Sequence, residues 1–164
     1  MAKGSTGTPA TVALTKASIA FTIHQYDHDP RSASYGLEAA AALGLAPALV
    51  FKTLIATVDG TPAVAIVPVT GSLDLKLLAS TLRGRRAELA DAALAQRLTG
   101  YVLGGISPVG QRKALVTVLD ESAQSLETIY VSGGRRGLDL GIAPADLLAI
   151  TSGQYAPIAR AERS

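Results

Sequence analysis

The hydrophobic pattern is clearest in the middle of the chain, where two apolar runs are separated by a short polar step. Residues 48–58 (ALVFKTLIATV) and 62–69 (PAVAIVPV) are rich in valine, isoleucine and other strand-forming residues. Asp59 and Gly60 lie between them, and an Asp-Gly pair favours the tight turn of a β-hairpin. The pattern therefore predicts a central hairpin of two long strands.

Shorter segments on both sides of this hairpin carry helical or strand patterns. Helical spacing of apolar residues, or helix start and stop signals, predict helices at 8–18, 37–44, 74–84, 87–98 and 144–151. Short runs separated by turn-forming or glycine-rich segments predict strands at 21–27, 101–105, 114–120, 128–132 and 138–142. The stretch 29–36 is typical of a turn.

The order of these elements predicts a single α+β domain. Strands outnumber helices and alternate with them, and the short spacing between the later strands favours a curved, mixed, barrel-like β-sheet with surrounding helices. We expect the domain to cover residues 8–157, between a flexible N-terminal tail at 1–7 and a C-terminal tail at 158–164. A chain of 164 residues is long enough for one domain with a substantial core.

Composition excludes several classes of protein. Hydrophobic residues make up 48% of the chain and charged residues 17%, which is typical of a globular domain. There is no cysteine, so disulfides and thiolate metal sites are excluded and a reducing compartment is expected. The longest apolar stretch, 39–51, falls short of the roughly 20 residues of a membrane span. With no signal-type segment at the N-terminus, the sequence predicts a cytoplasmic protein without a membrane partner.

Basic residues are grouped although the net charge is only +2. Grouped arginines and lysines on loops can neutralise phosphates, whereas the alternative is that they are solvated surface side chains. The three clusters are Arg83, Arg85 and Arg86, then Arg112 and Lys113, then Arg135 and Arg136.

Lys52 is the unusual residue of the first long strand. Side chains alternate along a strand, so Lys52 shares its face with four apolar residues, Val50, Leu54, Ala56 and Val58. Removing an ammonium group from water is costly unless it is paired. Lys52 therefore either points into a cavity that binds an anionic ligand or extends from the strand to solvent.

Two glycine-rich loops offer a second candidate for ligand binding. Residues 104–110 (GGISPVG) follow a predicted strand, and residues 132–137 (SGGRRG) add two arginines. Glycine lets backbone N–H groups face a ligand closely, which suits an oxyanion or a phosphate. Tight turns of β proteins also collect glycine, and this alternative stays open for each loop.

The familiar catalytic motifs are missing. His24 and His28 are four residues apart in a segment predicted to be a strand entering a turn, which is poor spacing for a metal site, and structural roles suit both residues better. The chain has no G-x-S-x-G nucleophile elbow, no P-loop and no G-x-G-x-x-G between a strand and a helix. We therefore predict no metal and no cofactor.

Four segments together resemble the YbaK family of bacterial aminoacyl-tRNA deacylases. They are HQYDHDP (24–30), FKTL (51–54), GYVLGGISPVGQRK (100–113) and ETIYVSGGRRGLDLGIAP (127–144). The family consists of free-standing domains related to the editing domain inserted in bacterial prolyl-tRNA synthetases. The resemblance extends over roughly residues 8–157 and implies a mixed α+β fold round a curved, barrel-like sheet.

The resemblance implies trans-editing, the removal of cysteine wrongly attached to proline tRNA. It assigns catalytic roles to Lys52, Gly104 and Gly105, and substrate-binding roles to Tyr26, Ile106, Ser107, Pro108, Gly110, Ser132 and Asp139. Backbone N–H groups of the 104–110 loop are the candidate oxyanion donors. The implied partners are mischarged proline tRNA and, transiently, prolyl-tRNA synthetase.

The resemblance also implies a mechanism that needs no enzyme nucleophile, because the cysteine thiol of the substrate attacks its own ester and leaves as a thiolactone. Two other functions stay open: a deacylase for another small aminoacyl group, and a non-catalytic module that binds tRNA ends or nucleotides. Three residues also have structural alternatives: cross-strand packing for Tyr26, an arginine partner for Asp139 and a loop cap for Ser132.

Overall fold

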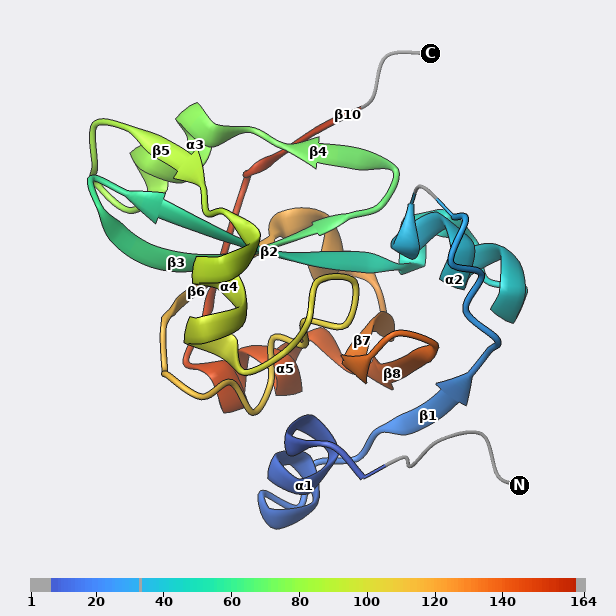
Figure 1. Ribbon diagram of the computed structural model, residues 1–164. Coiled ribbons are helices and arrows are strands. Elements are labelled where there is room, and N and C mark those ends of the chain that lie inside the picture. The colour runs from blue at the N-terminus through green and yellow to red at the C-terminus, as the bar shows by residue number, and fades with distance from the viewer. Residues whose placement is uncertain (1–6, 33, 162–164) are drawn as a thin grey trace.

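A five-stranded mixed sheet forms the centre of the fold (Figure 1). The computed structural model describes residues 7–32 and 34–161, so most of the predicted N-terminal tail and residues 162–164 lie outside the described residues. The strand order is β5 (Ala87–Leu89), β2 (Phe51–Val58), β3 (Thr61–Pro68), β6 (Val116–Asp120) and β9 (Gln154–Ala156). β2 and β3 pair antiparallel around Asp59 and Gly60, which confirms the predicted hairpin, and β6 and β9 continue the sheet in parallel.

Two smaller sheets lie beside the central one. The first has the order β1 (Thr22–Gln25), β8 (Leu138–Ile142) and β7 (Ile129–Arg135), and the second joins β4 (Gly71–Leu73) to β10 (Ala159–Ala161). One parallel bridge, Val50 to Tyr130, links the start of β2 to β7. The described strands form no closed barrel, because β5 and β9 end the central sheet without pairing to each other. The mixed α+β domain is confirmed, but the barrel-like sheet is not.

Side-chain caps determine where several helices begin. Thr8 caps α1 (Pro9–Lys16), Ser34 caps α2 (Tyr35–Leu43), and Asp74 caps α3 (Leu75–Thr81), each by accepting a backbone N–H of the first turn. α2 therefore begins two residues before its predicted start, inside the stretch predicted to be a turn. The remaining helices are α4 (Ala92–Thr99), α5 (Pro144–Thr151) and the short 3₁₀ turns η1 (Pro47–Leu49) and η2 (Glu121–Ser125).

The predicted helix at 87–98 is wrong in its first part. Asp91 caps α4 by accepting the Leu94 N–H at 2.8 Å, so the helix begins only after it. The preceding residues form β5, which pairs antiparallel with Ala56–Val58 at the edge of β2. A neighbouring strand edge with free hydrogen-bonding groups thus overrides the helical spacing of the apolar residues.

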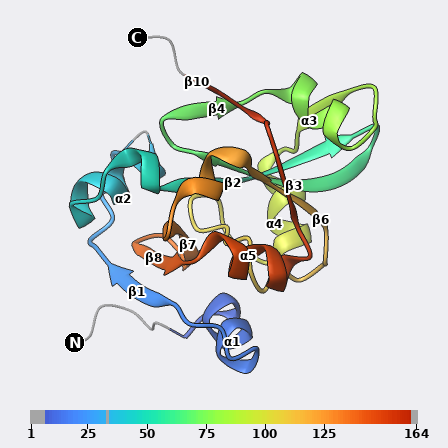
Figure 2. The same ribbon diagram turned by 180° about the vertical axis from the view of Figure 1, so that it is seen from behind.

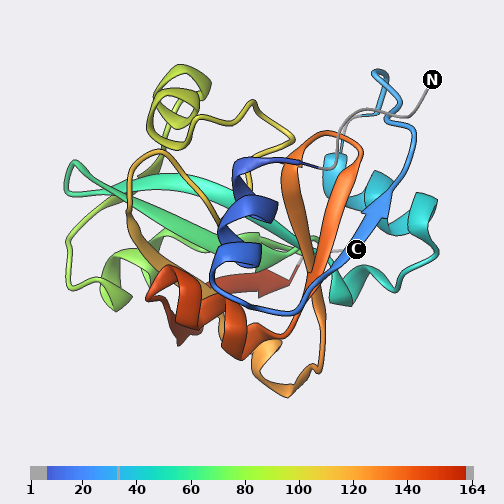
Figure 3. The same cartoon turned by 90° about the horizontal axis from the view of Figure 1, so that it is seen from below.

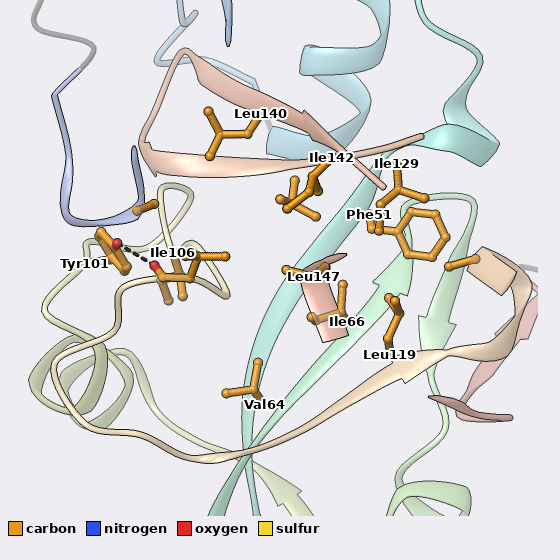
Figure 4. Close-up of a cluster of buried hydrophobic side chains, with 14 of the residues drawn as sticks. Phe51, Val64, Ile66, Tyr101, Ile106, Leu119, Ile129, Leu140, Ile142 and Leu147 are labelled. Carbon is orange, nitrogen blue, oxygen red and sulfur yellow. Dashed lines mark hydrogen bonds between the residues drawn. The ribbon is translucent and has the colours of Figure 1, made fainter. Parts of the chain in front are cut away.

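The predicted strand at 101–105 is also absent. Gly100 and Gly104 have φ values of 80° and 84°, which are incompatible with an extended strand, and the Gly105 N–H donates to the Val102 carbonyl at 2.8 Å in a turn. The segment is held instead by Tyr101, whose buried hydroxyl donates to the Val109 carbonyl at 2.7 Å (Figure 4).

The C-terminal segment belongs to the fold up to residue 161, although a tail was predicted from 158. Ile158 is fully buried, and Ala159–Ala161 pairs with Gly71–Leu73. Figure 2 shows this segment running from the end of the central sheet to β4. Asp120 fixes its start, because one carboxylate oxygen accepts the N–H groups of Ile158 at 3.0 Å and Ala159 at 2.8 Å. The sequence did not reveal this long-range contact.

Both faces of the central hairpin are covered by apolar side chains. Phe51, Ile55 and Ile66 belong to a large cluster shared with β7, β8 and α5 (Figure 4). Ala56 and Val58 belong to a second cluster on the opposite face, with Leu54 packed against it, as the strand pattern predicts. Lys52 lies on the side of this second face but beyond the cluster, at the start of β2.

No helix among the described residues is long and apolar enough to cross a membrane.

Replacing Asp120 tests the anchor of the C-terminal segment. We expect Asp120→Ala to lower the free energy of unfolding by about 2–4 kcal/mol, because the buried N–H of Ile158 loses its acceptor and the chain loses further hydrogen bonds. Urea denaturation measures this. Glu121→Ala, at an exposed neighbouring position, is the control and should change stability by less than about 0.5 kcal/mol. Equal effects of the two substitutions would contradict the assignment.

Candidate functional site

A cleft of about 330 Å³ opens where the start of β2 meets α2 and the β1–β8–β7 sheet. Segments far apart in the sequence contribute to its lining. Six of the predicted site residues line it: Tyr26, Lys52, Gly104, Ile106, Ser132 and Asp139. The other lining residues are Ser34, Tyr35, Gly36, Ala39, Val50, Phe51, Thr53, Leu54 and Leu103.

The small sheet lines this cleft with two polar side chains of one face, Ser132 and Asp139. His24, Asp139 and Ser132 are cross-strand neighbours on β1, β8 and β7, so their side chains point to the same side. Because side chains alternate, Leu138 and Leu140 on β8 point to the opposite side, where Leu140 belongs to the core. Figure 3 shows β1 running alongside the β7–β8 hairpin that carries these residues.

Lys52 contributes the positive charge of the cleft. The residue is half-buried in β2, and among the described residues no carboxylate lies within 4.0 Å of its ammonium nitrogen. Its position on the cleft lining, with apolar residues behind it, favours the cavity over the alternative of a side chain extending to bulk solvent. The ammonium is therefore available to an anionic ligand.

Asp139 contributes a buried carboxyl. The residue is 6% exposed, and burial raises its pKa from 3.8 to about 7. In the described part of the chain its side chain accepts no hydrogen bond and forms no ion pair, so the arginine partner considered from the sequence is absent there. Since buried charges are normally paired, Asp139 is an unusual feature of this site.

Tyr26 follows β1 and lines the cleft next to these groups. Its pKa is raised to about 12, first by burial and then by the negative charges of Asp139 and Glu38. The Tyr26 hydroxyl therefore stays protonated near neutral pH and can donate a hydrogen bond to a ligand. Its backbone N–H donates to the Gly137 carbonyl at 3.0 Å, which fixes the end of β1 against the β7–β8 turn.

The first part of the 104–110 loop borders the cleft. Gly104 has φ 84°, and a Cβ there would lie 2.9 Å from ring carbons of Tyr35, so glycine allows the aromatic ring to pack on the loop. Gly104 and Ile106 line the cleft, and within the described residues their N–H groups donate to no protein acceptor. Gly105 differs, because its N–H already donates to Val102.

The second part of the loop is turned away from the cleft. Ser107 is fully buried, and its Oγ accepts the Val109 N–H at 3.2 Å. Gly110 has φ 72° and packs on the backbone of α1, where a Cβ would lie 2.5 Å from the Pro9 carbonyl oxygen. Pro108 and Gly110 border a separate cavity of about 170 Å³. The structure therefore does not bring Gly105, Ser107, Pro108 and Gly110 to the cleft lining.

Tyr35 and Arg136 form part of the rim, and sequence reasoning missed Tyr35. The Arg136 guanidinium carbon lies 5.2 Å from the centroid of the Tyr35 ring, and its Nε donates to the Leu103 carbonyl at 2.8 Å. The signal was present in the sequence, because Ser34 is a good N-cap and would have placed Tyr35 at the start of a helix. The prediction of a turn over residues 29–36 hides this helix start.

None of the three basic clusters lines the cleft, although Arg136 contacts two of its lining residues, Tyr35 and Leu103. Lys113, of the second cluster, borders the separate cavity beside Pro108. Arg135 follows the β7 bulge, and its backbone packs against Gly105. Arg85 and Arg86 lie instead near the hairpin turn, where their backbone N–H groups donate to Asp59. β5 pairs with the far end of β2, which places that cluster roughly 20 Å along the strand from Lys52.

Thr53 is a second residue that the sequence did not single out. It lines the cleft from β2, and its Oγ1 is buried without a hydrogen-bond partner among the described residues. A buried hydroxyl normally has a partner, so this oxygen is open to a polar ligand atom. A threonine in a strand gives no sequence signal that would separate this role from ordinary β propensity.

The two histidines have local partners. The His24 Nε2 lies 2.8 Å from the Thr22 Oγ1, and its ring packs edge to face on Tyr130 with centroids 5.2 Å apart. The His28 Nδ1 lies 2.8 Å from a carboxylate oxygen of Glu38. In residues 7–32 and 34–161 no three histidine, aspartate or glutamate side chains are grouped as metal ligands would be.

Comparison with known proteins gives a consistent family match. Residues 30–150 match the family model described as the aminoacyl-tRNA editing domain. A protein of Enterococcus faecalis described as a candidate Cys-tRNA(Pro)/Cys-tRNA(Cys) deacylase, EbsC, is 39% identical over 124 residues, which cover 75% of this chain and 76% of that protein. The resemblance found in the sequence is confirmed.

Solved structures share the fold. The crystal structure of the hypothetical protein APE2540 matches with a TM-score of 0.84 and 25% identity, covering 93% of this chain and 100% of that one. A candidate trans-editing enzyme for prolyl-tRNA synthetase matches with a TM-score of 0.85 and 23% identity, covering 97% and 99%. The second likeness is evidence for the fold alone.

The buried Asp139 gives stability a defined pH dependence. Below about pH 4 the carboxyl is protonated in both the folded and the unfolded chain, so it has no effect. Between about pH 4 and 7 it ionises in the unfolded chain only, which lowers stability, and above its folded pKa of about 7 the loss is complete. We expect Asp139→Asn to leave stability at pH 4 nearly unchanged and to raise it by a few kcal/mol at pH 8, measured by urea denaturation. A stabilisation that does not change with pH would contradict this account.

Proposed function

We propose that the cleft of this chain, a deacylase of the aminoacyl-tRNA editing domain family, binds the aminoacyl end of mischarged proline tRNA. The chain thereby removes cysteine from that tRNA. The observation that carries the proposal is the cleft itself. Lys52, Tyr26, Ser132, Asp139 and Gly104 come from separate segments and line one cavity of about 330 Å³. That volume is within the usual range of small-molecule sites, about 300–1,000 Å³.

Lys52 binds the nucleotide side of the substrate. Its ammonium is unpaired in the described part of the chain, so the phosphate or ribose of the terminal adenosine can provide the counter-charge. Arg136 lies at the rim of the same cleft, held over Tyr35 and bonded to the Leu103 carbonyl. Its position suits a neighbouring phosphate of the single-stranded tRNA end.

Gly104 and Ile106 provide the N–H groups for the oxyanion. Both line the cleft and donate to no acceptor among the described residues. Gly105, which the family resemblance placed beside them, is unsuitable because its N–H is bonded to Val102. One oxyanion donor typically contributes about 2.7–4 kcal/mol to lowering the barrier.

The substrate supplies the nucleophile. The cysteine thiolate attacks the carbonyl carbon of its own ester, the oxyanion of the tetrahedral intermediate is held by the loop, and the C–O bond to the ribose breaks. The released ribose oxygen takes a proton, and the thiolactone formed then hydrolyses to free cysteine. A thiol of pKa about 8.5 is a few per cent ionised near neutral pH and is strongly nucleophilic. Because the thiol and the ester belong to one molecule, the protein contributes by holding the aminoacyl group in the conformation in which the sulfur meets the carbonyl carbon.

The basic surface of the domain is small, and this favours a synthetase partner that supplies recognition of the tRNA. Arg136 contacts two lining residues of the cleft, Tyr35 and Leu103, whereas Arg85 and Arg86 are remote from it. Few phosphate contacts imply weak, salt-sensitive binding to tRNA. Selection of proline tRNA is therefore expected to come from a transient complex with prolyl-tRNA synthetase, the enzyme associated with one structural relative.

Substitution of Lys52 tests the assignment of the cleft. We expect Lys52→Ala to lower kcat/KM for cysteinyl proline tRNA by about 100-fold or more, because the anionic part of the substrate loses its buried counter-charge. Lys52→Arg should also be poor, because a planar guanidinium does not replace a compact ammonium in a confined site. Lys76→Ala, at an exposed position of α3, is the control and should keep the wild-type rate. A folded Lys52→Ala protein with wild-type activity would contradict the proposal.

Changing the substrate tests the thiol mechanism. Single-turnover rates with cysteinyl, seryl and alanyl proline tRNA should fall in that order, steeply from cysteine to serine, because a hydroxyl is far less nucleophilic and a methyl group cannot attack. Similar rates for cysteine and alanine would show that a water molecule attacks instead. Release of alanine or serine in preference to cysteine would assign the domain to another small aminoacyl group, and binding without turnover would make it a binding module.

A further inference from the structure

The carboxyl of Asp139 lacks a partner within the described protein. It is 6% exposed on β8, lines the cleft, and neither accepts a protein hydrogen bond nor forms an ion pair in the described residues. Leaving a buried ionisable group without a partner lowers stability, and such groups are rarely kept for structural reasons. A ligand that brings its own cation would remove this cost.

The polar groups closest to Asp139 along the sheet are engaged elsewhere. The cross-strand neighbour His24 is bonded to Thr22 at 2.8 Å, and the Oγ of the other neighbour, Ser132, accepts the Gly134 N–H at 3.3 Å within the β7 bulge. Lys52 lines the same cleft, but no ion pair joins it to Asp139. The protein therefore leaves the carboxylate open toward the cleft.

The proposed substrate carries one cation at the end that must enter this cleft. An aminoacyl ester has a free α-amino group, which titrates near neutral pH, and a neighbouring carboxylate favours its charged ammonium form. We propose that Asp139 binds the α-ammonium group of the aminoacyl substrate, an inference that rests on the proposed function. Asp139 then marks the part of the cleft that holds the amino acid. Lys52 and Asp139 then bind opposite charges at the two ends of one ligand.

Binding of the α-ammonium group by Asp139 would make the cleft selective against substrates whose α-amino group is blocked. An aminoacyl group whose nitrogen is acylated, as in a peptidyl ester, has no positive charge and cannot pair with Asp139. It would leave the carboxylate buried and unpaired in the complex, which discriminates strongly against it. The cleft would thereby favour free aminoacyl esters over esters of blocked amino acids.

A pair of substrates that differ only in the amino group tests the proposal. The full-length protein is given proline tRNA charged with cysteine, or with 3-mercaptopropionate, which keeps the thiol and the chain length but lacks the α-amino group. Wild-type protein should prefer the cysteinyl ester in kcat/KM by about 10- to 100-fold, the range for one charge-assisted hydrogen bond. Asp139→Asn should lose most of this preference by slowing the cysteinyl reaction, with little change for the deaminated ester.

The outcomes separate this inference from the proposed function. Equal rates for the two esters with wild-type protein, or an Asp139→Asn variant that slows both equally, would overturn the role of Asp139 while leaving the deacylase intact. If the protein hydrolyses neither ester, the proposed function is overturned and the inference with it. Asp146→Asn, which removes a carboxylate of α5 outside the cleft lining, is the control and should keep the wild-type preference. The comparison of the two esters with wild-type protein decides whether the α-amino group is recognised, independently of the Asp139→Asn variant.

Discussion

Alternation of side chains along two strands, β2 and β8, is the constraint on which the site depends. On β8, Leu140 points into the core while Asp139 between its leucine neighbours points to the cleft. On β2, Ile55 and Ala56 belong to the two apolar clusters on opposite faces. Lys52 lies on the same face as Ala56, beyond the end of that cluster. A one-residue shift of either strand would exchange core and cleft residues, so packing of the core also fixes the chemistry of the cleft.

Opposite charges are held apart in this cleft rather than paired. The Lys52 ammonium is half-buried, and the Asp139 carboxyl is nearly fully buried with its pKa raised to about 7. If the two groups formed an ion pair, each would satisfy the other and neither would be open to a ligand. Their separation lowers the stability of the free domain and suits the proposed ligand, which has an anionic nucleotide end and a cationic amino end.

Local patterns in the sequence predicted the structural features that depend on residues close together in the chain. The Asp59-Gly60 hairpin and the placement of Lys52 follow from strand periodicity and turn chemistry, and both are present in the structure. Pairing between distant segments could not be predicted in this way. β5 replaces part of a predicted helix because the edge of β2 is free to pair, and Asp120 holds Ile158 across a long stretch of chain.

The same limit applies to the site. The family motifs indicated Tyr26, Lys52 and Asp139, which the structure brings together, but they treated residues 104–110 as one functional loop. Only its first part reaches the cleft, because Gly110 is needed for close packing on α1. Thr53 lines the cleft without a clear signal in its own sequence neighbourhood, whereas Tyr35 follows the helix N-cap Ser34 inside a segment predicted to be a turn.

We propose that one cleft holds the aminoacyl adenosine end of the substrate between Lys52 and Asp139. The decisive experiment is a crystal structure with a non-hydrolysable analogue, in which an amide replaces the ester between cysteine and adenosine 5′-phosphate. We expect the analogue to occupy this cleft, with its ammonium on Asp139 and its phosphate or ribose on Lys52. Binding at the separate cavity beside Pro108, or binding in the cleft with the ammonium directed to solvent, would contradict it.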